Sequence, residues 1–245
     1  MKKIVLITGA NRGLGLETAR QMGLLGYSVV VAARDEKKAD VAAHYLTAQG
    51  IEAHPIKLDI TNESDHEQVS QFLDRRFGRL DVLINNAGVQ LDFPSFIPGN
   101  NSKVVSGEVL RSTFETNYFG PVLLTSKLLP LLEKSEAGRI VNVSSIMGSM
   151  ALHSDVDSPI HGIKLLAYNS SKTALNQFTI HLAAALQGTN IKVNSAHPGW
   201  VKTNLGGDYA PMETPEGAKT IVDLSLIDEQ GPEGAFIHLG EVIPW

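Results

Sequence analysis

The segment IVLITGANRGLG, residues 4–15, decides how this chain folds. Its leading apolar residues have the length and composition of a buried strand, and residues 14–25 have a helical pattern. Between the two, Gly9 permits a tight turn, Gly13 lets the backbone approach a phosphate, and Gly15 lets the helix pack closely against the strand. Because a helix N-terminus attracts phosphate, the segment indicates a dinucleotide site, although glycines near a turn also occur in plain loops.

Short apolar runs and longer helical patterns alternate along the rest of the chain. The apolar runs lie at 4–7, 28–32, 82–84, 139–143 and 191–194, and the helical patterns at 14–25, 36–49, 64–77, 108–134 and 167–186. Strands that alternate with helices form right-handed crossovers and a parallel sheet covered on both faces. The pattern predicts an α/β fold: a single doubly wound Rossmann-type domain over 1–245, with a parallel sheet of about seven strands and helices on both faces. The cofactor-binding part is expected over about 1–140 and the catalytic and substrate part over about 141–245.

Composition excludes several classes of function. The chain has 245 residues, of which 43% are hydrophobic and 19% charged, which suits one domain with a full core. A net charge of −5 without a basic run argues against nucleic acid as a partner. There are no cysteines, and the eight histidines lack metal-ligand spacing, so we expect no metal. Neither a signal peptide nor a membrane-length apolar stretch is present, so we expect a cytoplasmic protein with no membrane partner.

The residues after the second strand indicate which dinucleotide binds. Enzymes that prefer NAD place Asp or Glu there to bind the ribose 2′-hydroxyl, whereas a 2′-phosphate requires positive charge. Here Ala33 takes the acidic position, Arg34 follows it, and Arg12 in the glycine turn adds a second cation. The sequence therefore predicts NADP(H) with Arg34 as a bidentate phosphate ligand, unless Asp35 pairs with Arg34 and weakens the charge.

Tyr168 and Lys172 lie four residues apart in a helical pattern. Such residues share one helix face, so the phenol and the ammonium can point into the same cleft. An ammonium close to a phenol favours the phenolate, and we expect it to lower the pKa of Tyr168 so that the phenol becomes a usable acid near neutral pH. A surface pair without a catalytic role is the alternative for these two residues taken alone.

Taken together, these motifs resemble the short-chain dehydrogenase/reductase family over essentially the whole chain. The pairing of Arg12 with Arg34 and the C-terminal ending are most similar to the NADPH-dependent carbonyl reductase branch, which includes plant menthone and salutaridine reductases. The motifs occur in the order of the family, and they are Thr8-Gly9, Asn85-Asn86-Ala87-Gly88, Asn117, Ser145, Tyr168, Lys172 and Pro198-Gly199.

The resemblance implies four catalytic residues. Tyr168 would donate a proton to the substrate carbonyl oxygen, and Ser145 would hydrogen-bond the same oxygen. Ser144 is the rival to Ser145, and because strand side chains alternate, only one of the two is expected to face the cleft; the family pattern selects Ser145. Lys172 would lower the pKa of Tyr168 and bind the nicotinamide ribose.

Asn117 is the fourth catalytic residue that the resemblance implies. Pro121 lacks the N–H that would normally bond the carbonyl of Asn117 in a helix, so this carbonyl is left free. In the family it holds a water that passes protons to the lysine. A simple proline kink in a long helix is the alternative.

The resemblance also implies a set of cofactor contacts. Asp59 and Ile60 would bind the adenine, unless Asp59 only caps the next helix, and the Asn-Ala-Gly run would lie beside the adenosine ribose, unless it is only a turn that ends a strand. Val201 and Thr203 would contact the nicotinamide amide, and residues 205–209 are expected to form a glycine-rich lid. The expected contacts are Gly9, Asn11, Arg12, Gly13, Leu14, Gly15, Arg34, Asp59, Ile60, Asn86, Ala87, Gly88, Tyr168, Lys172, Pro198, Gly199, Val201 and Thr203.

Two stretches depart from the family pattern. Ser145 and Tyr168 are separated by 22 residues, longer than the usual interval, with an insertion near 152–163, and a long loop spans 90–105. Both are expected to shape the substrate pocket. Mostly apolar lining residues favour a hydrophobic ketone, although apolar loop residues are also often local packing. The expected lining residues are Gln90, Phe93, Met147 and Trp200.

We therefore expect an NADPH-dependent carbonyl reductase that acts on a small carbonyl or alcohol substrate. The alternatives are an NADP-dependent alcohol dehydrogenase that works mainly in the oxidative direction, and a protein that senses NADP(H) without turnover. The C-terminal residues lack the Val-Asp-Gly-Gly run of tetrameric members, so a monomer is favoured and a homodimer is possible.

Overall fold

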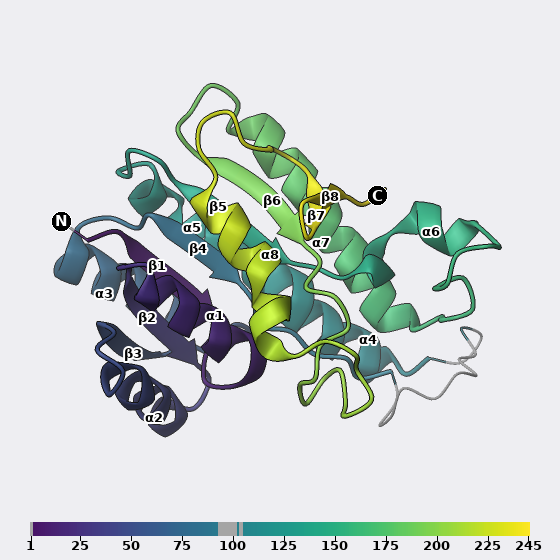
Figure 1. Cartoon of the computed structure of the whole chain (residues 1–245), viewed down its shortest axis with the longest axis horizontal. Coiled ribbons are helices and arrows are strands. Elements are labelled where there is room, and N and C mark those ends of the chain that lie inside the picture. Colours follow the sequence, from purple (N-terminus) through teal and green to yellow (C-terminus); the bar gives the residue numbers. More distant parts are fainter. Residues whose placement is uncertain (1, 93–101, 103–104) are drawn as a thin grey trace.

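The computed structural model describes residues 2–92, 102 and 105–245, and the predicted α/β doubly wound domain is confirmed. Within these residues one sheet has the strand order β3-β2-β1-β4-β5-β6-β7-β8 (Figure 1). All neighbours pair in parallel except β7 and β8, which are antiparallel. The strands are β1 Ile4–Thr8, β2 Ser28–Ala33, β3 Ala53–Lys57, β4 Val82–Asn85, β5 Arg139–Val143, β6 Lys192–Ala196, β7 Phe236–His238 and β8 Glu241–Val242.

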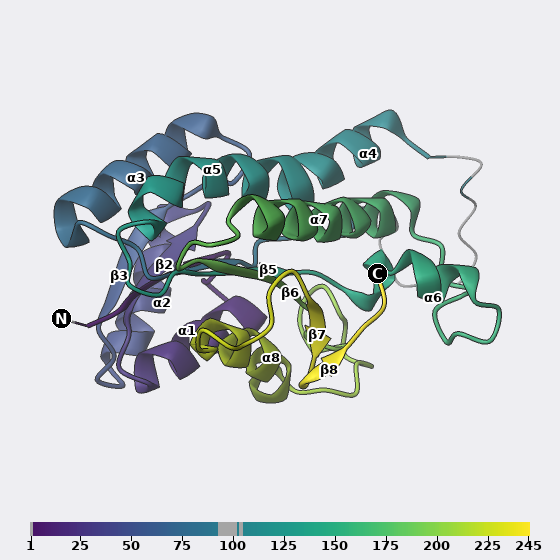
Figure 2. The same ribbon diagram turned by 90° about the horizontal axis from the view of Figure 1, so that it is seen from above.

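Helices cover both faces of this sheet (Figure 2). Helices α1, α2 and α8 pack on one face, and α3, α5 and α7 pack on the other. The helices are α1 Gly13–Leu24, α2 Glu36–Thr47, α3 Glu63–Phe77, α4 Gly107–Phe114, α5 Gly120–Leu132, α6 Met150–Ser154, α7 Leu166–Ala185 and α8 Thr214–Leu226. No helix among the described residues is long and apolar enough to cross a membrane.

The strands are buried on both faces because successive side chains enter different cores. On β1, Val5 and Ile7 pack with α1, α2 and α8, whereas Ile4 and Leu6 pack with α3, α5 and α7. A strand that is apolar at every position satisfies both cores, which is why the first strand reads as a continuous apolar run.

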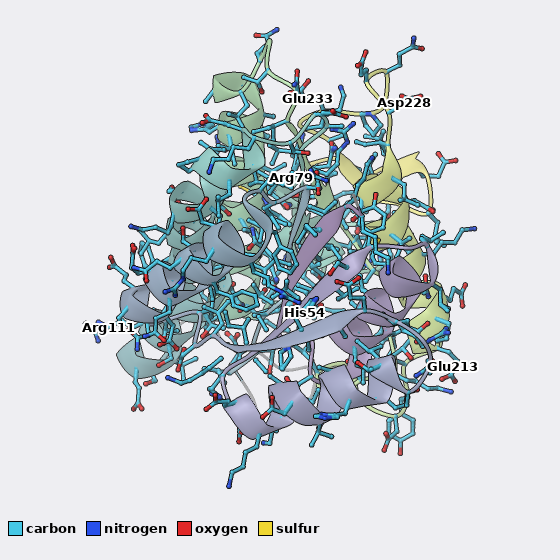
Figure 3. All side chains as sticks on the ribbon, turned by 90° about the vertical axis from the view of Figure 1, so that its left-hand side faces the viewer. His54, Arg79, Arg111, Glu213, Asp228 and Glu233 are labelled. Atoms are coloured by element: carbon cyan, nitrogen blue, oxygen red, sulfur yellow. The ribbon has the colours of Figure 1, made fainter. Side chains whose placement is uncertain are left out.

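Several charged side chains lie at the surface of the molecule. Figure 3 views the molecule from the left-hand side of Figure 1, and Arg111, Glu213 and Asp228 lie at the periphery there.

Several elements, among them β3, β7, β8 and α8, had no counterpart in the expected ranges. The edge strand β3 carries Pro55 and is only half-buried, so it lacks an apolar run. The short strands β7 and β8 and the helix α8 follow the expected ranges along the chain. The eighth strand, β8, is a two-residue antiparallel addition to the seven parallel strands.

The single helix expected over 108–134 is wrong in one respect, because a π-helical turn interrupts it. Helix α4 ends at Phe114, the π-turn η1 spans Glu115–Phe119, and α5 begins at Gly120. In the π-turn the N–H of Gly120 bonds the carbonyl of Glu115, five residues back. Asn117 lies within this π-turn, and its side chain is fully buried.

Candidate active site

A cavity of about 550 Å³ lies at the carboxyl ends of β1, β4, β5 and β6. This is the edge of an open α/β sheet where ligands bind, and the volume suits a cofactor with a small substrate. All the residues expected to contact the cofactor line it, although their contacts with the cofactor stay predictions. Segments far apart in the chain therefore meet here, and the cavity continues from the glycine turn to Tyr168.

At one end, the glycine turn disfavours side chains, either through its backbone conformation or through close neighbours. Gly9 and Gly13 have positive φ angles of 65° and 53°, a conformation that favours glycine. A Cβ on Gly15 would lie 2.6 Å from the carbonyl oxygen of Gly9 and 2.5 Å from Nδ2 of Asn86. The turn is thus packed against residues beyond β4 as well as against its own strand.

Two arginines face this end of the cavity. Arg12 immediately precedes α1 and makes no side-chain cap there, and Arg34 follows β2. Asp35, which was considered as a partner for Arg34, instead caps α2 by accepting a hydrogen bond of 3.2 Å from the N–H of Lys38. The predicted positive charge at this end is therefore not cancelled by the cap residue.

Asp59 lies beside Arg34 and does not cap α3. Asn62 has that role, because its Oδ1 accepts from the N–H of Ser64 at 3.0 Å. Burial acts to raise the pKa of the Asp59 carboxyl, but hydrogen bonds from Thr61 and the charge of Arg34 together lower it. An ionised carboxylate therefore lies next to Arg34 at the predicted adenine position.

The Asn86-Ala87-Gly88 segment after β4 is hydrogen-bonded to the end of β1. Nδ2 of Asn86 donates to the carbonyl of Thr8 at 2.8 Å, and Oγ1 of Thr8 accepts from the N–H groups of Asn86 and Ala87 at 3.0 and 2.9 Å. The run ends a strand and also lines the cavity, so the two interpretations of its sequence are compatible.

At the other end, Tyr168, Ser145 and Lys172 come together. Tyr168 is 7% exposed and hydrogen-bonds with Ser145. Lys172 lies one turn later on α7, donates to the carbonyl of Val143 at 2.8 Å, and has its Nζ 5.8 Å from the centre of the Tyr168 ring. The i,i+4 spacing thus places both side chains at the cavity.

The expected lowering of the Tyr168 pKa is wrong for this structure. Burial raises the pKa of the phenol to about 12, an effect that the hydrogen bond with Ser145 reduces only in part. Burial also lowers the pKa of Lys172 to about 8, because the charged ammonium is desolvated. At neutral pH the phenol is therefore protonated, which is the form that can donate a proton.

Ser144 and Ser145 both line the cavity, so alternation along the strand does not separate them. The reason is that β5 ends at Val143, before either serine. The two differ in their partners: Ser145 hydrogen-bonds with Tyr168, whereas Oγ of Ser144 is buried without a partner in the described part of the chain. The geometry favours Ser145 for the role beside the tyrosine.

Asn117 does not line the cavity, although Thr116 does. Its side-chain amide joins the segment after β4 to α7: Oδ1 accepts from the N–H of Val89 at 2.8 Å, and Nδ2 donates to the carbonyl of Val89 at 2.8 Å and to Oγ of Ser171 at 3.0 Å. Oγ of Ser171 in turn donates to the carbonyl of Tyr168 at 2.7 Å. The proposed water relay through the Asn117 carbonyl stays a prediction.

Asp92 was missed by the sequence analysis. Helix α7 has no cap from its own preceding residue, Leu165. Instead the two carboxylate oxygens of Asp92 accept from the N–H groups of Ala167 and Tyr168 at 2.8 and 2.9 Å. Asp92 thus fixes the backbone of Tyr168 from 76 residues away, and no local pattern could have indicated it.

The side of the cavity beside Tyr168, where the substrate is expected, has an apolar wall. Met147 and Trp200 line it as expected, together with Leu205 of the expected lid segment. The insertion contributes Ile160 and Ile163, which pack with Met147 and Tyr168 in a small separate hydrophobic cluster. Figure 1 shows α6 and the segment after it at one end of the molecule.

Two predicted lining residues do not join this wall. Gln90 is absent from the cavity lining formed by the described residues, and its Nε2 is buried without a partner among them. Phe93 lies outside the described residues, as does much of the loop expected over 90–105. The pocket-shaping role of that loop stays a prediction.

The chain is similar to known proteins over nearly its whole length. Residues 3–214 match the family model described as short chain dehydrogenase. The short-chain dehydrogenase anuI of Penicillium roqueforti is 37% identical over 227 residues, which cover 90% of this chain and 87% of that protein. Mouse carbonyl reductase [NADPH] 1 is 32% identical over 282 aligned positions, which cover 100% and 99%. Among solved structures, the NADPH-bound carbonyl reductase from chicken fatty liver has a TM-score of 0.86 at 27% identity and covers 100% of this chain and 99% of that one.

Proposed function

The chain belongs to the short-chain dehydrogenase family, and we propose that it is an NADPH-dependent carbonyl reductase that transfers hydride to a ketone or aldehyde. The family predicted from the motifs, with its carbonyl reductase branch, is confirmed. One observation carries the proposal. A protonated tyrosine, hydrogen-bonded to a serine and followed one turn later by a lysine, lies in the same cavity as the glycine turn and its two arginines.

The residues at the glycine turn fit a dinucleotide with a 2′-phosphate. The positive φ angles of Gly9 and Gly13 keep side chains out of the turn in front of α1, where a pyrophosphate is attracted to the helix N-terminus. Arg12 and Arg34 supply charge for the 2′-phosphate, and Ala33 presents no carboxylate to repel it. When bound, NADPH would supply the hydride.

Tyr168 acts as the general acid in this proposal. Reduction of a carbonyl places negative charge on its oxygen, which a donated proton neutralises. Because its pKa is about 12, Tyr168 holds that proton at neutral pH. Ser145 is already hydrogen-bonded to Tyr168. It is therefore placed to hydrogen-bond the substrate carbonyl oxygen and so to orient the carbonyl.

The same pKa determines which form of Tyr168 is present near neutral pH, whereas the balance between reduction and oxidation is set by the equilibrium of the reaction itself. Oxidation of an alcohol requires the phenolate to accept a proton, and a pKa of about 12 keeps that form scarce. Lys172, with a pKa of about 8, carries most of its charge at neutral pH and loses it in mild alkali. We assign Lys172 to the nicotinamide ribose and to the return of a proton to Tyr168.

The apolar wall favours an uncharged hydrophobic carbonyl compound as substrate. Met147, Ile160, Ile163 and Leu205 offer no group that would pair with a phosphate or carboxylate. Trp200 is 50% exposed and presents a flat apolar surface at the same side. An aryl or alicyclic ketone matches this chemistry better than a sugar or an acid.

The proposal is tested by the loss of reduced-nicotinamide absorbance with NADPH and with NADH, across a panel of aryl, alicyclic and aliphatic ketones and aldehydes. We expect NADPH to be consumed with at least one apolar carbonyl compound, and NADH to be used less well. If NADPH binds but no compound is reduced, the carbonyl reductase proposal fails and a protein that only senses NADP(H) gains support.

A further inference from the structure

His197 follows β6 and lies at the boundary of two loops that reach the cavity. Its side chain is 8% exposed. Nδ1 of its ring accepts from the N–H of Ile146 at 3.3 Å and from the N–H of Gly199 at 3.4 Å. Both distances are longer than a typical N–H···O hydrogen bond, as expected for two N–H groups that share one ring nitrogen as acceptor.

The two N–H groups belong to loops with different tasks. Ile146 follows Ser145, the serine beside Tyr168, on the loop after β5. Gly199, with a φ of 89°, begins the loop after β6 that continues to Thr203 beside the glycine turn. One ring nitrogen therefore joins the serine loop to the loop that we assign to the nicotinamide.

The strands themselves cannot supply this connection. β5 and β6 pair in parallel up to Val143 and Ala196, and one more backbone bond runs from the N–H of Ser144 to the carbonyl of Ala196 at 2.8 Å. Beyond it the chains separate into the two loops. Among the described residues, the next hydrogen bond between them runs from the N–H of Ile146 to the ring of His197, one residue after Ala196.

The environment keeps the accepting lone pair available. Accepting at Nδ1 requires the ring proton to be on Nε2. His238, whose ring centre is 4.7 Å away, donates from its Nδ1 to the carbonyl of His197 at 2.9 Å. Burial, and secondarily His238, lower the pKa of His197 to about 3, so the ring stays neutral over the working range.

We propose that His197 is a positioning residue that holds Ser145 in register with the nicotinamide loop. The proposal rests on the reductase function proposed above, since it concerns how the substrate oxygen and the hydride donor are aligned. His197 does not transfer a proton. It acts through the N–H groups of Ile146 and Gly199, and small displacements of a reacting pair reduce the rate steeply.

Two amide variants separate this role from packing. In His197→Asn, the Oδ1 atom takes the place of Nδ1 and keeps an acceptor there. In His197→Gln, the amide lies one bond further out, so its oxygen and nitrogen reach the level of the outer ring atoms and no acceptor remains at the Nδ1 position. Both are polar and similar in size to histidine. We expect His197→Gln to lower kcat by about ten- to a hundredfold, with an NADPH Kd within about threefold of wild type, and His197→Asn to keep about half of wild-type kcat.

Amide hydrogen exchange of peptides that cover 144–149 and 198–206 gives a readout without turnover. We expect faster exchange in both segments for His197→Gln and wild-type exchange for His197→Asn. Equal kcat and equal exchange in the two variants would overturn the proposal, whether both match wild type or both are impaired. If wild type reduces no carbonyl compound, the reductase function fails, and the exchange measurement still decides whether His197 joins the loops.

Discussion

At the glycine-turn end of the cavity, residues 8–15, backbone geometry sets the shape, whereas at the tyrosine end, residues 143–172, buried side chains set it. The first end has positive φ angles, no room for a Cβ on Gly15, and arginines at its edge. The second end has a phenol whose pKa burial raises to about 12 and an ammonium whose pKa burial lowers to about 8. The difference suggests that one end determines binding and the other determines rate, and that each can be changed without the other.

Loss of the phenol hydroxyl should lower turnover without weakening NADPH binding. Tyr168→Phe removes the proton donor, and we expect kcat to fall about 10³-fold while the NADPH Kd stays within about threefold of wild type. Stopped-flow rates and NADPH fluorescence titration check the two values. The matched control is Tyr27→Phe, a buried tyrosine in the core beneath α1 and α2, which should keep wild-type kcat. Unchanged turnover in Tyr168→Phe would remove this residue from the mechanism.

Removal of one arginine at the glycine-turn end should weaken the binding of NADPH and leave that of NADH almost unchanged. For Arg34→Ser we expect the KM for NADPH to rise about 30-fold, because a charge-assisted phosphate contact is lost, and the KM for NADH to change little. The control is Arg75→Ser on α3, where Nε of the arginine donates to the carbonyl of Gln71 at 3.2 Å, one turn back on the same helix. A parallel rise in the KM for NADH would contradict the assignment of Arg34 to the 2′-phosphate.

Acid should lower the free energy of unfolding through the buried ring of His197. Its folded-state pKa of about 3 lies below the ordinary 6.5, so between these values the unfolded chain binds a proton that the folded chain does not. Stability is therefore lost as pH falls from about 6.5. At pH 5 this histidine should account for about 2 kcal/mol of lost unfolding free energy. Urea denaturation at pH 7 and pH 5 should show a smaller loss for His197→Asn than for wild type, and equal losses would contradict the depressed pKa.

Substitution of Asp92, which caps α7 from a distant loop, should have the smallest effect on stability and turnover. Asp92→Ala leaves two N–H groups of the first turn without their acceptor, and we expect a loss of about 1 kcal/mol of unfolding free energy together with a few-fold lower kcat. Asp92→Asn retains one acceptor oxygen and should lose less. Thermal denaturation and steady-state rates give both numbers. An unchanged melting temperature for Asp92→Ala would show that the cap does not stabilise the helix.

These two ends also differ in how far the sequence alone could predict them. The glycine turn is a local pattern, with strand, turn and helix within 21 consecutive positions from Ile4 to Leu24, so its fold and residues could be predicted from spacing. Tyr168 and Lys172 share a helix face, so their proximity was equally predictable. The pKa of Tyr168 was not, because it depends on the burial supplied by segments distant in sequence.

The rest of the tyrosine end depends on contacts between residues that are far apart in the chain. Asp92 reaches Tyr168 across 76 positions, Asn117 reaches Ser171 across 54, and His197 reaches Ile146 across 51. No periodicity or motif encodes such a pair. The π-turn at Glu115–Phe119 was hidden for a similar reason, since its residues continue the helical pattern on both sides.

The central claim is that this cavity moves a hydride from NADPH to a carbonyl carbon. The most direct test uses NADPH that carries deuterium at the transferred position, an apolar ketone that supports turnover, and mass spectrometry of the product. We predict an alcohol with one deuterium on its carbinol carbon, formed by wild type and not by Tyr168→Phe within the same time. Consumption of NADPH without a deuterated alcohol would contradict the account.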